Sequence, residues 1–489
     1  MDKVQAGSPT SGVLITAGAR HRGGSAAGGR TGARALRALG ALGLLGVPAS
    51  AFLLAAGAAE KPSSYVPGRS GGWPHWLAGP LEGVGVGITS HSFQTLTLIM
   101  CASYLAVLLT ARTLPLWAIA AAIVAANVIL LLGPPLISQD VFGYIGFARM
   151  GALHGLDPYT HVAAEAPSDP VLAYLGWPFK HSPYGPLFTL ASYGTTPLGL
   201  AGGLWFFKSL AVICSLGSVA LIARAARSLG HSARWAMVYV GLNPVLLELA
   251  VGGAHNDTLM LLLVAGALAI TAGATESRAT RYSRSAFARP RHRGSLPAET
   301  ARMCAAAATV VLAVGVKVTA GLLLPFLVLA PSRLRQRLQV AGTALAGLAA
   351  LAIVGLLGFG VHALGFLNAV GEQQQLVAVH SVPAETARLV GLTGTPGWWR
   401  HLFIAGFLVV LVLALWRTAR GSDWRVAAGW TMLALLLSTA WLLPWYAIWV
   451  LPLAAVGSDR RLRVAALLFC AYAILIHLPL AGPLLSPRG

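Results

Sequence analysis

The chain has 489 residues, of which 56% are hydrophobic and 10% are charged, and its formal net charge is +20. A typical soluble domain has about 25% charged residues, so this composition excludes a soluble domain, which could not cover its surface with so few charges. The positive residues are mostly arginines in short segments between apolar runs, as in cytoplasmic loops of membrane proteins, and this distribution does not favour nucleic-acid binding. The 4 cysteines show no CxxC or Cys/His spacing, so they predict neither a disulfide framework nor a zinc site.

The chain begins with a basic segment. Residues 1–34 are rich in Gly, Ser, Ala and Arg and have no apolar period, which predicts a disordered tail on the cytoplasmic side. Three apolar spans then carry the chain out, back and out again, near 35–58, 92–111 and 114–135. Residues 136–200 are therefore expected to form a first outer loop with interfacial helices, in which 186–200 is an interfacial or re-entrant segment.

The rest of the chain alternates in the same way. A long basic loop at 276–302 is expected inside, and a second outer loop at 361–399. Further spans are predicted near 204–226, 233–252, 256–274, 337–360, 401–418 and 463–481, with two short or broken helices around Lys317 and a tight hairpin over 426–456. Residues 35–489 would thus form one all-α polytopic membrane domain with about 13 crossings and every Arg-rich loop on one side.

The densest polar chemistry falls in the first outer loop. Residues 140–154 have helical spacing, and Gly155 with the following Asp157-Pro158 predicts the end of that helix and a turn. We expect an amphipathic helix that lies on the outer leaflet. Asp140, at its start, has two compatible interpretations. It could cap the free backbone N–H groups of the helix, or act as a general base towards a sugar hydroxyl.

Other polar residues stand near membrane boundaries. Lys317 lies in an otherwise apolar segment, at a cost of about 2.5 to 3.5 kcal/mol at a helix centre; it would bind an anion such as a lipid phosphate or snorkel to the interface. His255-Asn256-Asp257 would be a metal or proton-relay site, or a polar hairpin in which Asp257 caps the next helix. Four aromatic residues predict an interfacial belt, with sugar stacking as the alternative: Trp441, Trp445, Tyr446 and Trp449. No Gly-rich phosphate loop, HExxH helix or Walker motif supports ATP-driven transport or zinc proteolysis.

An acidic residue just after an early outward span, followed by an outer loop of amphipathic helices, resembles the GT-C class of membrane glycosyltransferases. Within that class the chain is similar to the actinobacterial polyprenol-phosphate-mannose-dependent α-1,6-mannosyltransferases, from about residue 90 onward. The similarity is carried, in order, by Asp140-Val-Phe-Gly-Tyr144, Gly155-Leu-Asp-Pro-Tyr159, Tyr184-Gly-Pro-Leu187, His255-Asn-Asp257, Lys317 and Pro444-Trp-Tyr446.

The resemblance implies a GT-C fold and transfer of mannose from polyprenyl-phosphate-mannose to a growing α-1,6-mannan, the backbone of lipomannan and lipoarabinomannan. The reaction would take place on the outer side of the plasma membrane. Because the donor is β-linked, an α product implies inversion in a single displacement. Asp140 would be the base, while Lys317 with Arg149 or His255 would bind the donor phosphate. Substrate contacts are expected from Tyr144, Asp157, Tyr159, His181, Tyr184, Asn256, Asp257, Trp445 and Tyr446, with no metal or other cofactor.

Two alternatives stay open at this point. A transporter or lipid flippase would also be polytopic and basic inside, but it should show matching halves, which the sequence lacks. A GT-C enzyme with another sugar or acceptor, such as an arabinosyl, glucosyl or protein O-mannosyl transferase, would share the same pattern.

Overall fold

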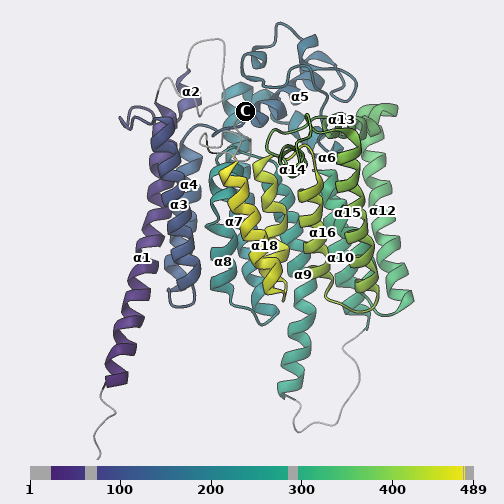
Figure 1. Cartoon of the computed structure of the whole chain (residues 1–489). Helices are drawn as coiled ribbons and strands as arrows, with labels where there is room; N and C mark the ends of the chain where they lie inside the picture. The colour runs from purple at the N-terminus through teal and green to yellow at the C-terminus, as the bar shows by residue number, and fades with distance from the viewer. Residues whose placement is uncertain (1–23, 61–73, 285–295, 477, 479–489) are drawn as a thin grey trace, which may run out of the picture.

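The computed structural model describes residues 24–60, 74–284, 296–476 and 478. The described residues form helices and loops without a β-strand. The long helices run side by side, and shorter helices, among them α5, α6 and α13, lie at the upper end of the bundle in Figure 1.

Five helical stretches are long and apolar enough to cross a membrane, and a sixth candidate consists of two short helices bent by 44°. The first is the Arg34–Ala59 part of α1 (Gly24–Ala59). The other four contain α3 (Ser90–Thr110), α7 (Gly199–Ser228), α12 (Leu334–Phe359) and α15 (Gly397–Ala419). The bent pair is α8 (Ala233–Gly241) with the π-helical turn η4 (Val245–Val251). The chain is therefore an all-helical protein with several helices of membrane-spanning length, as predicted, while the count of 13 crossings stays a prediction.

The remaining helices of the bundle are shorter or broken, apart from α9, which has 28 residues but is apolar only over Asp257–Gly273. They are α4 (Leu116–Leu132), α9 (Asp257–Arg284), α10 (Leu296–Val314), η5 (Val318–Leu323), α11 (Leu324–Leu329), α16 (Trp424–Ser438), η7 (Pro444–Val450), α17 (Leu451–Val456) and α18 (Arg460–Leu475). The predicted break at Lys317 and the predicted 426–456 hairpin are both present, because α10 gives way to η5 at Lys317 and α16 turns back into η7.

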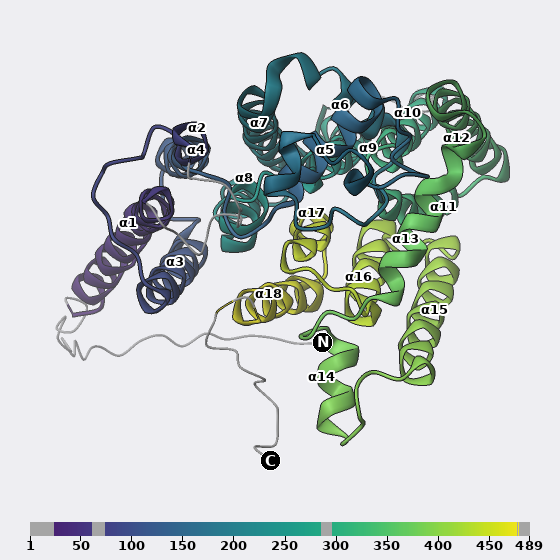
Figure 2. The same cartoon turned by 90° about the horizontal axis from the view of Figure 1, so that it is seen from above.

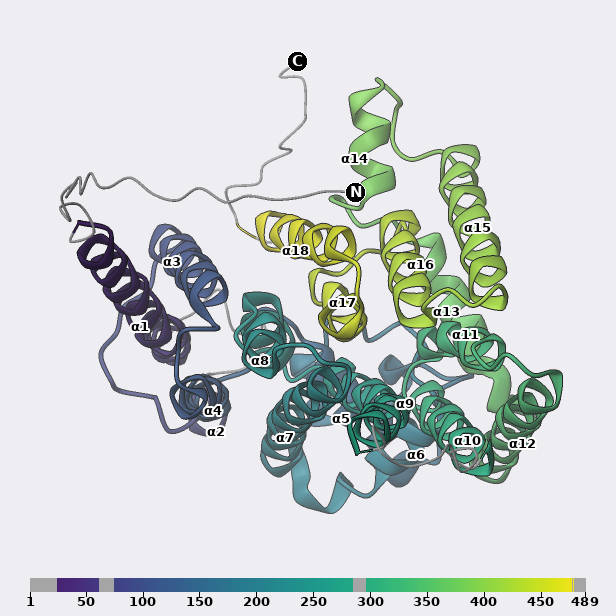
Figure 3. The same ribbon diagram turned by 90° about the horizontal axis from the view of Figure 1, so that it is seen from below.

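The helices of the bundle pack around one apolar core that extends from α1 to α18. α1 packs against α3 and α4 at one edge of the molecule, seen from above in Figure 2 and from below in Figure 3. On the other side α7 packs against α9, α10 against α9 and α12, and α15 against α16. Large apolar side chains project outward from these helices, as at Leu357, which is 84% exposed. Such side chains suit a lipid environment better than water.

The upper end carries short helices from two loops. The first loop contributes α5 (Asp140–His154), η1 (Ala163–Glu165), η2 (Pro170–Tyr174), α6 (Pro186–Tyr193) and η3 (Thr196–Leu198). The second contributes η6 (Gly360–Leu364), α13 (Gly365–Gln375) and α14 (Val382–Leu389), and the single turn α2 (His75–Ala78) lies near α1. With 8 residues, α6 is far too short to cross a bilayer at about 1.5 Å per residue, which agrees with the predicted interfacial segment.

Helix α5 has the predicted boundaries but a different environment. It begins at Asp140 and ends at His154, where Gly155 adopts the left-handed conformation (φ 64°) and the following Leu156 N–H donates to the Met150 carbonyl at 3.0 Å. The prediction of an amphipathic helix on the outer leaflet was wrong, because α5 is buried almost all round. It contacts α7 of the bundle as well as α6, η1 and η2 of its own loop, so the loop covers the face that was expected to meet the membrane surface.

Two boundaries also differ from the prediction. α1 begins at Gly24, so residues 24–34, which we expected in the disordered tail, are helical. The basic loop 276–302 is shorter than predicted, because α9 continues to Arg284 and α10 starts at Leu296. Residues 1–23 of the tail and 285–295 of the loop lie outside the described residues.

Candidate functional site

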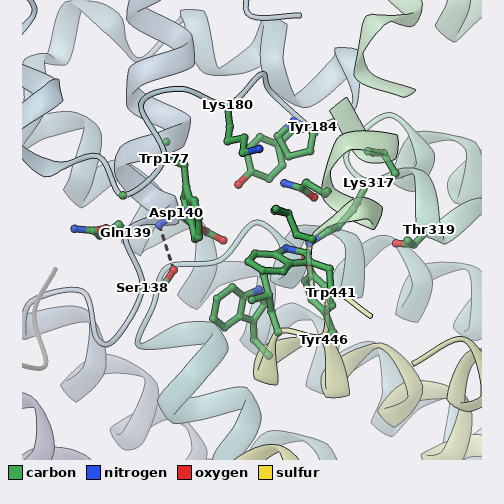
Figure 4. A pocket seen from close by; sticks show the side chains of 18 of the residues that line it. Ser138, Gln139, Asp140, Trp177, Lys180, Tyr184, Lys317, Thr319, Trp441 and Tyr446 are labelled. Atoms are coloured by element: carbon green, nitrogen blue, oxygen red, sulfur yellow. Dashed lines mark hydrogen bonds between the residues drawn. The ribbon is translucent and has the colours of Figure 1, made fainter. Parts of the chain in front are cut away.

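A cavity of about 430 Å³ lies at the upper end of the bundle, between α5, α13, α16 and the segments around η5 and η7. This volume falls in the range of about 300 to 1,000 Å³ that is usual for small-molecule sites. Six of the predicted site residues line it: Asp140, His181, Tyr184, Lys317, Trp445 and Tyr446. Asp140 and Lys317 approach it from opposite sides (Figure 4). Seven predicted residues do not line it: Tyr144, Arg149, Asp157, Tyr159, His255, Asn256 and Asp257.

Asp140 is the first residue of α5, and the helix cap is Gln139, whose side chain makes no capping hydrogen bond. The interpretation of Asp140 as the N-cap was therefore wrong. The carboxylate still lies in the first turn, where the helix dipole favours a negative charge. The approach to this position is a tight turn, in which Ile137 has a positive φ of 69° and Ser138 Oγ accepts the Asp140 N–H at 3.1 Å.

His255 lies directly behind Asp140. Its ring is fully buried, its Nδ1 is 3.3 Å from Asp140 Oδ2, and it stacks on Trp445 with ring centroids 3.9 Å apart. Neither ring nitrogen makes a well-aligned hydrogen bond to another described residue. The Asp140 side chain is 17% exposed, so it faces the cavity while His255 supports it from the protein side.

Lys317 lies at the opposite side of the cavity, in extended backbone between α10 and η5. Its Nζ donates to both carboxylate oxygens of Asp257, at 2.8 and 3.0 Å, and lies 4.5 Å from the Tyr446 ring centroid and 5.1 Å from that of Trp449. Asp257 is only 1% exposed and also accepts the Trp449 indole N–H at 2.6 Å. Lys317 is thus held by a carboxylate and two aromatic faces, a cation–π arrangement that suits a partly desolvated charge.

Tyr144 and Asn256 fasten α5 to the start of α9. The Tyr144 hydroxyl donates to Asn256 Oδ1 at 3.3 Å and accepts the Asn256 N–H at 3.1 Å. Tyr144 is 1% exposed and packs edge-on against Tyr184 and Phe188. These hydrogen bonds therefore hold α5, which begins at Asp140, next to α9, which begins at Asp257.

Asp157 and Tyr159 form a turn away from the cavity. Asp157 Oδ1 accepts the Tyr159 N–H at 2.9 Å, a local arrangement typical of Asp in turns. The Tyr159 hydroxyl donates to the Tyr184 carbonyl at 2.9 Å, so the turn supports the segment that carries Tyr184. His181 in the same segment lies 3.2 Å from Glu372 of α13, which joins the two upper loops.

Arg149 also lies away from the cavity. Its Nε is 2.9 Å from Asp169 Oδ1, and His154 Nε2 is 2.8 Å from Asp169 Oδ2. Burial alone would raise the pKa of Asp169, but hydrogen bonds from Arg149, the Val171 N–H and His154 hold that pKa below its usual value. These contacts of Asp169, which precedes η2, with Arg149 and His154 of α5 hold η2 against α5.

Sequence reasoning missed part of the lining. Lys180 of the first loop, Gln373 and Gln374 of α13, and Trp177 all line the cavity. The signal for Trp177 and Lys180 was their place in an aromatic and polar stretch beside His181. Trp449 was placed in an interfacial belt, and its spacing of four from Trp445 was the signal for a shared role. Among the described residues, no group of three or more His, Cys, Asp or Glu side chains converges in a way that could hold a metal ion.

Comparison with known sequences places this geometry in context. A family model described as the alpha-(1->6)-mannopyranosyltransferase N-terminal domain matches residues 37–333, and a second, the MptB C-terminal domain, matches 394–487. Two relatives are named alpha-(1->6)-mannopyranosyltransferase A. The chain is 29% identical over 370 residues to that of Mycobacterium tuberculosis, covering 69% of this chain and 65% of the relative, and 30% identical over 206 residues to that of Corynebacterium glutamicum, covering 41% and 36%.

The matched region thus spans slightly less than two thirds of the first relative's length and just over one third of the second's. A probable alpha-(1->6)-mannopyranosyltransferase of Mycolicibacterium smegmatis is 31% identical over 164 residues, which cover 32% of this chain and 27% of that protein. No solved structure matches the chain significantly.

Proposed function

Because the chain belongs to the actinobacterial alpha-(1->6)-mannopyranosyltransferase family, we propose that it is a membrane mannosyltransferase that uses polyprenyl-phosphate-mannose as donor. The acceptor is a growing α-1,6-mannan, such as the backbone of lipomannan and lipoarabinomannan. The observation that carries the proposal is one cavity with a carboxylate, Asp140, on one side and a fixed cation, Lys317, on the other.

Asp140 is the general base in this proposal. The acceptor hydroxyl oxygen attacks the anomeric carbon of the donor, its proton passes to the Asp140 carboxylate, and the new glycosidic bond forms. Asp140 suits this role because it is the one carboxylate among the described residues that line the cavity. With the β-linked donor, a single displacement gives the α product. His255, stacked on Trp445, acts as a positioning residue that keeps the carboxylate aimed into the cavity.

Lys317 stabilises the leaving group. The bond between the anomeric carbon and the phosphate oxygen breaks, and its electron pair stays on the polyprenyl phosphate, which gains negative charge. A preorganised cation where charge develops is an effective catalytic device. Asp257 and Trp449 hold Lys317 before the substrate binds, so little reorganisation accompanies the reaction. No proton is needed by a phosphate leaving group, which agrees with the single carboxylate at the cavity.

The proposal places the cavity on the extracytoplasmic side of the plasma membrane, within a GT-C fold of about 13 crossings. Support comes from the charge distribution, since the Arg-rich connection of α7 to α8 and that of α15 to α16 lie at the lower end of the bundle, opposite the cavity (Figure 1).

The test uses membranes that contain the chain, labelled polyprenyl-phosphate-mannose and an α-1,6-mannose disaccharide. We expect labelled trisaccharide, with a rate that is unaffected by a chelator. Parallel reactions with polyprenyl-phosphate-linked arabinose or glucose, and with a serine-rich peptide acceptor, address the other members of the GT-C class. Transfer only from another donor, or no transfer at all, would contradict the mannosyl assignment, and transfer of mannose only to the peptide would contradict the mannan acceptor.

A further inference from the structure

Two tryptophans from distant parts of the chain meet at the cavity. Trp177 follows η2 in the first upper loop, and Trp441 lies between α16 and η7. Their ring centroids are 5.7 Å apart at an interplanar angle of 81°, and both rings line the cavity together with Asp140. Figure 4 labels Trp177 beside Asp140 and Trp441 beside Tyr446.

Packing gives an incomplete account of this pair. Trp177 is 51% exposed, so it buries little of the apolar surface that makes tryptophan valuable in a core. Neither indole N–H donates a hydrogen bond to another residue in the described part of the chain. An interfacial belt would place such rings towards lipid, whereas these two face the cavity. The pair therefore offers an aromatic face and two free donors to a ligand.

The position of Trp177 is tied to Asp140 rather than to Lys317. Gly176, the preceding residue, lies so close to the Gln139 side chain that a Cβ at this position would collide with the amide of Gln139. Gln139 in turn immediately precedes Asp140, at the N-cap position of α5. The aromatic rings near Lys317 are different ones, those of Tyr446 and Trp449. The two ends of the cavity thus have separate aromatic surfaces.

A pyranose ring combines an apolar face of C–H groups with a rim of hydroxyls. An indole can pack against the C–H face and donate its N–H to the rim, so an exposed tryptophan pair suits a neutral sugar better than it suits a phosphate or a lipid chain. In the proposed reaction the donor phosphate lies at Lys317, and the acceptor hydroxyl must reach Asp140. The sugar beside Asp140 is then the acceptor.

We infer that Trp177 and Trp441 form the acceptor subsite, which binds the terminal hexose of a neutral, α-linked oligosaccharide and presents its hydroxyl to Asp140. This inference rests on the proposed function. It assigns recognition of the acceptor to two loops at the cavity, and leaves the donor to Lys317 and its aromatic neighbours.

The experiment measures the Michaelis constants for both substrates with the full-length protein. We compare wild type, Trp177→Ala, Trp177→Phe and Trp441→Ala. The control is Trp398→Ala, since Trp398 is 55% exposed and forms a similar edge contact with Trp399 (5.5 Å, 83°) but does not line the cavity. The alanine variants at the cavity should raise the acceptor KM about tenfold, with donor KM unchanged, because one aromatic contact is lost from binding. Trp177→Phe should lie between them and wild type, and Trp398→Ala should match wild type.

An acceptor KM for Trp177→Ala within twofold of wild type would overturn the inference, and so would an equal rise in the donor KM. If wild type transfers no mannose, the proposed function fails, and equilibrium dialysis with labelled α-1,6-mannose disaccharide then tests the subsite alone. Binding to wild type that Trp177→Ala weakens about tenfold supports the subsite. Absence of binding, or equal binding by both proteins, overturns it.

Discussion

The two sides of the cavity are built from the same pair of elements but are held differently. The turn into α9 supplies His255 to the Asp140 side and, at the first residue of the helix, Asp257 to the Lys317 side. Similarly, η7 supplies Trp445 to the Asp140 side and Trp449 to the Lys317 side. Lys317 is fixed by two short contacts to Asp257, at 2.8 and 3.0 Å, whereas Asp140 has a single 3.3 Å contact to His255.

This difference suits two different chemical tasks. A cation that stabilises a leaving group works best when it is fixed in advance, because no reorganisation is then required during the reaction. A general base must keep a lone pair free for the proton it receives, and its hydrogen bonds tighten only when substrate is bound. The tightly held Lys317 therefore suits stabilisation of the leaving group, and the loosely held Asp140 suits transfer of a proton.

Asp140→Asn should have the largest effect on the rate. The amide keeps the shape of the side chain but cannot accept the proton, so kcat should fall about 10²- to 10⁴-fold, while the donor KM stays near its wild-type value. Steady-state kinetics with purified protein check this. A variant that retains the wild-type rate would show that the loosely held side does not perform the proton transfer.

Lys317→Ala should have the next largest effect. Loss of one preorganised group at the developing charge typically costs about 10²- to 10³-fold in kcat. The matched control is Lys180→Ala, because Lys180 is the other lysine that lines the cavity among the described residues and it has no carboxylate partner among the ion pairs of those residues. We expect less than a tenfold change for the control. Equal losses for both variants would mean that net positive charge in the cavity matters, and not the fixed position of Lys317.

Asp169→Asn should loosen the first upper loop without removing a side chain that lines the cavity. Asp169 pairs with Arg149 away from both sides of the cavity, and removal of one partner from a buried pair costs on the order of 3 kcal/mol. Hydrogen–deuterium exchange of residues 156–184 should increase. Because the folded-state pKa of Asp169 is lowered, its stabilisation is present above its unfolded-state pKa of about 3.9 and is lost as the pH falls through the folded-state value.

Wild type should therefore approach the exchange behaviour of Asp169→Asn as the pH is lowered below about 4. Asp423→Asn is the control, since the Asp423 pair with Arg425 is more exposed and should contribute less than about 1 kcal/mol. Unchanged exchange in the Asp169 variant would show that residues 156–184 are held against α5 by apolar contacts alone.

Glu372→Gln should have the smallest effect. Its contact with His181 joins the two upper loops at 3.2 Å, but the side chains are 41% and 29% exposed. Exposed pairs of this kind contribute about 0 to 1 kcal/mol. Kinetic constants should change less than about fivefold, and a larger loss would reveal that the second loop takes part in the chemistry of the cavity.

The sequence predicted the features that depend on local chemistry. Gly155 ended α5 where expected, and the charge of Lys317 marked the break between α10 and η5, because helix ends and breaks are encoded by neighbouring residues. The family resemblance was confirmed by the matching family models.

Features that depend on distant residues were not predicted. The contact of Lys317 with Asp257 joins residues 60 positions apart, and no local pattern indicates such a partner. The environment predicted for α5 was wrong for the same reason. The segments that bury this helix, among them η2, α6 and α7, all lie further along the chain. Asp157 and Tyr159 lie in a turn behind Tyr184 and do not line the cavity, and their expected contact with substrate stays a prediction.

The most direct test of the central claim, that Asp140 acts as a base in a single displacement, is the anomeric configuration of the product. The β-linked donor is incubated with wild-type protein and the α-1,6-mannose disaccharide, and the new linkage is determined by proton NMR. We predict an α linkage, which requires inversion. A β linkage would mean retention through a double displacement, with a carboxylate as nucleophile, and would contradict the role of Asp140 as the base.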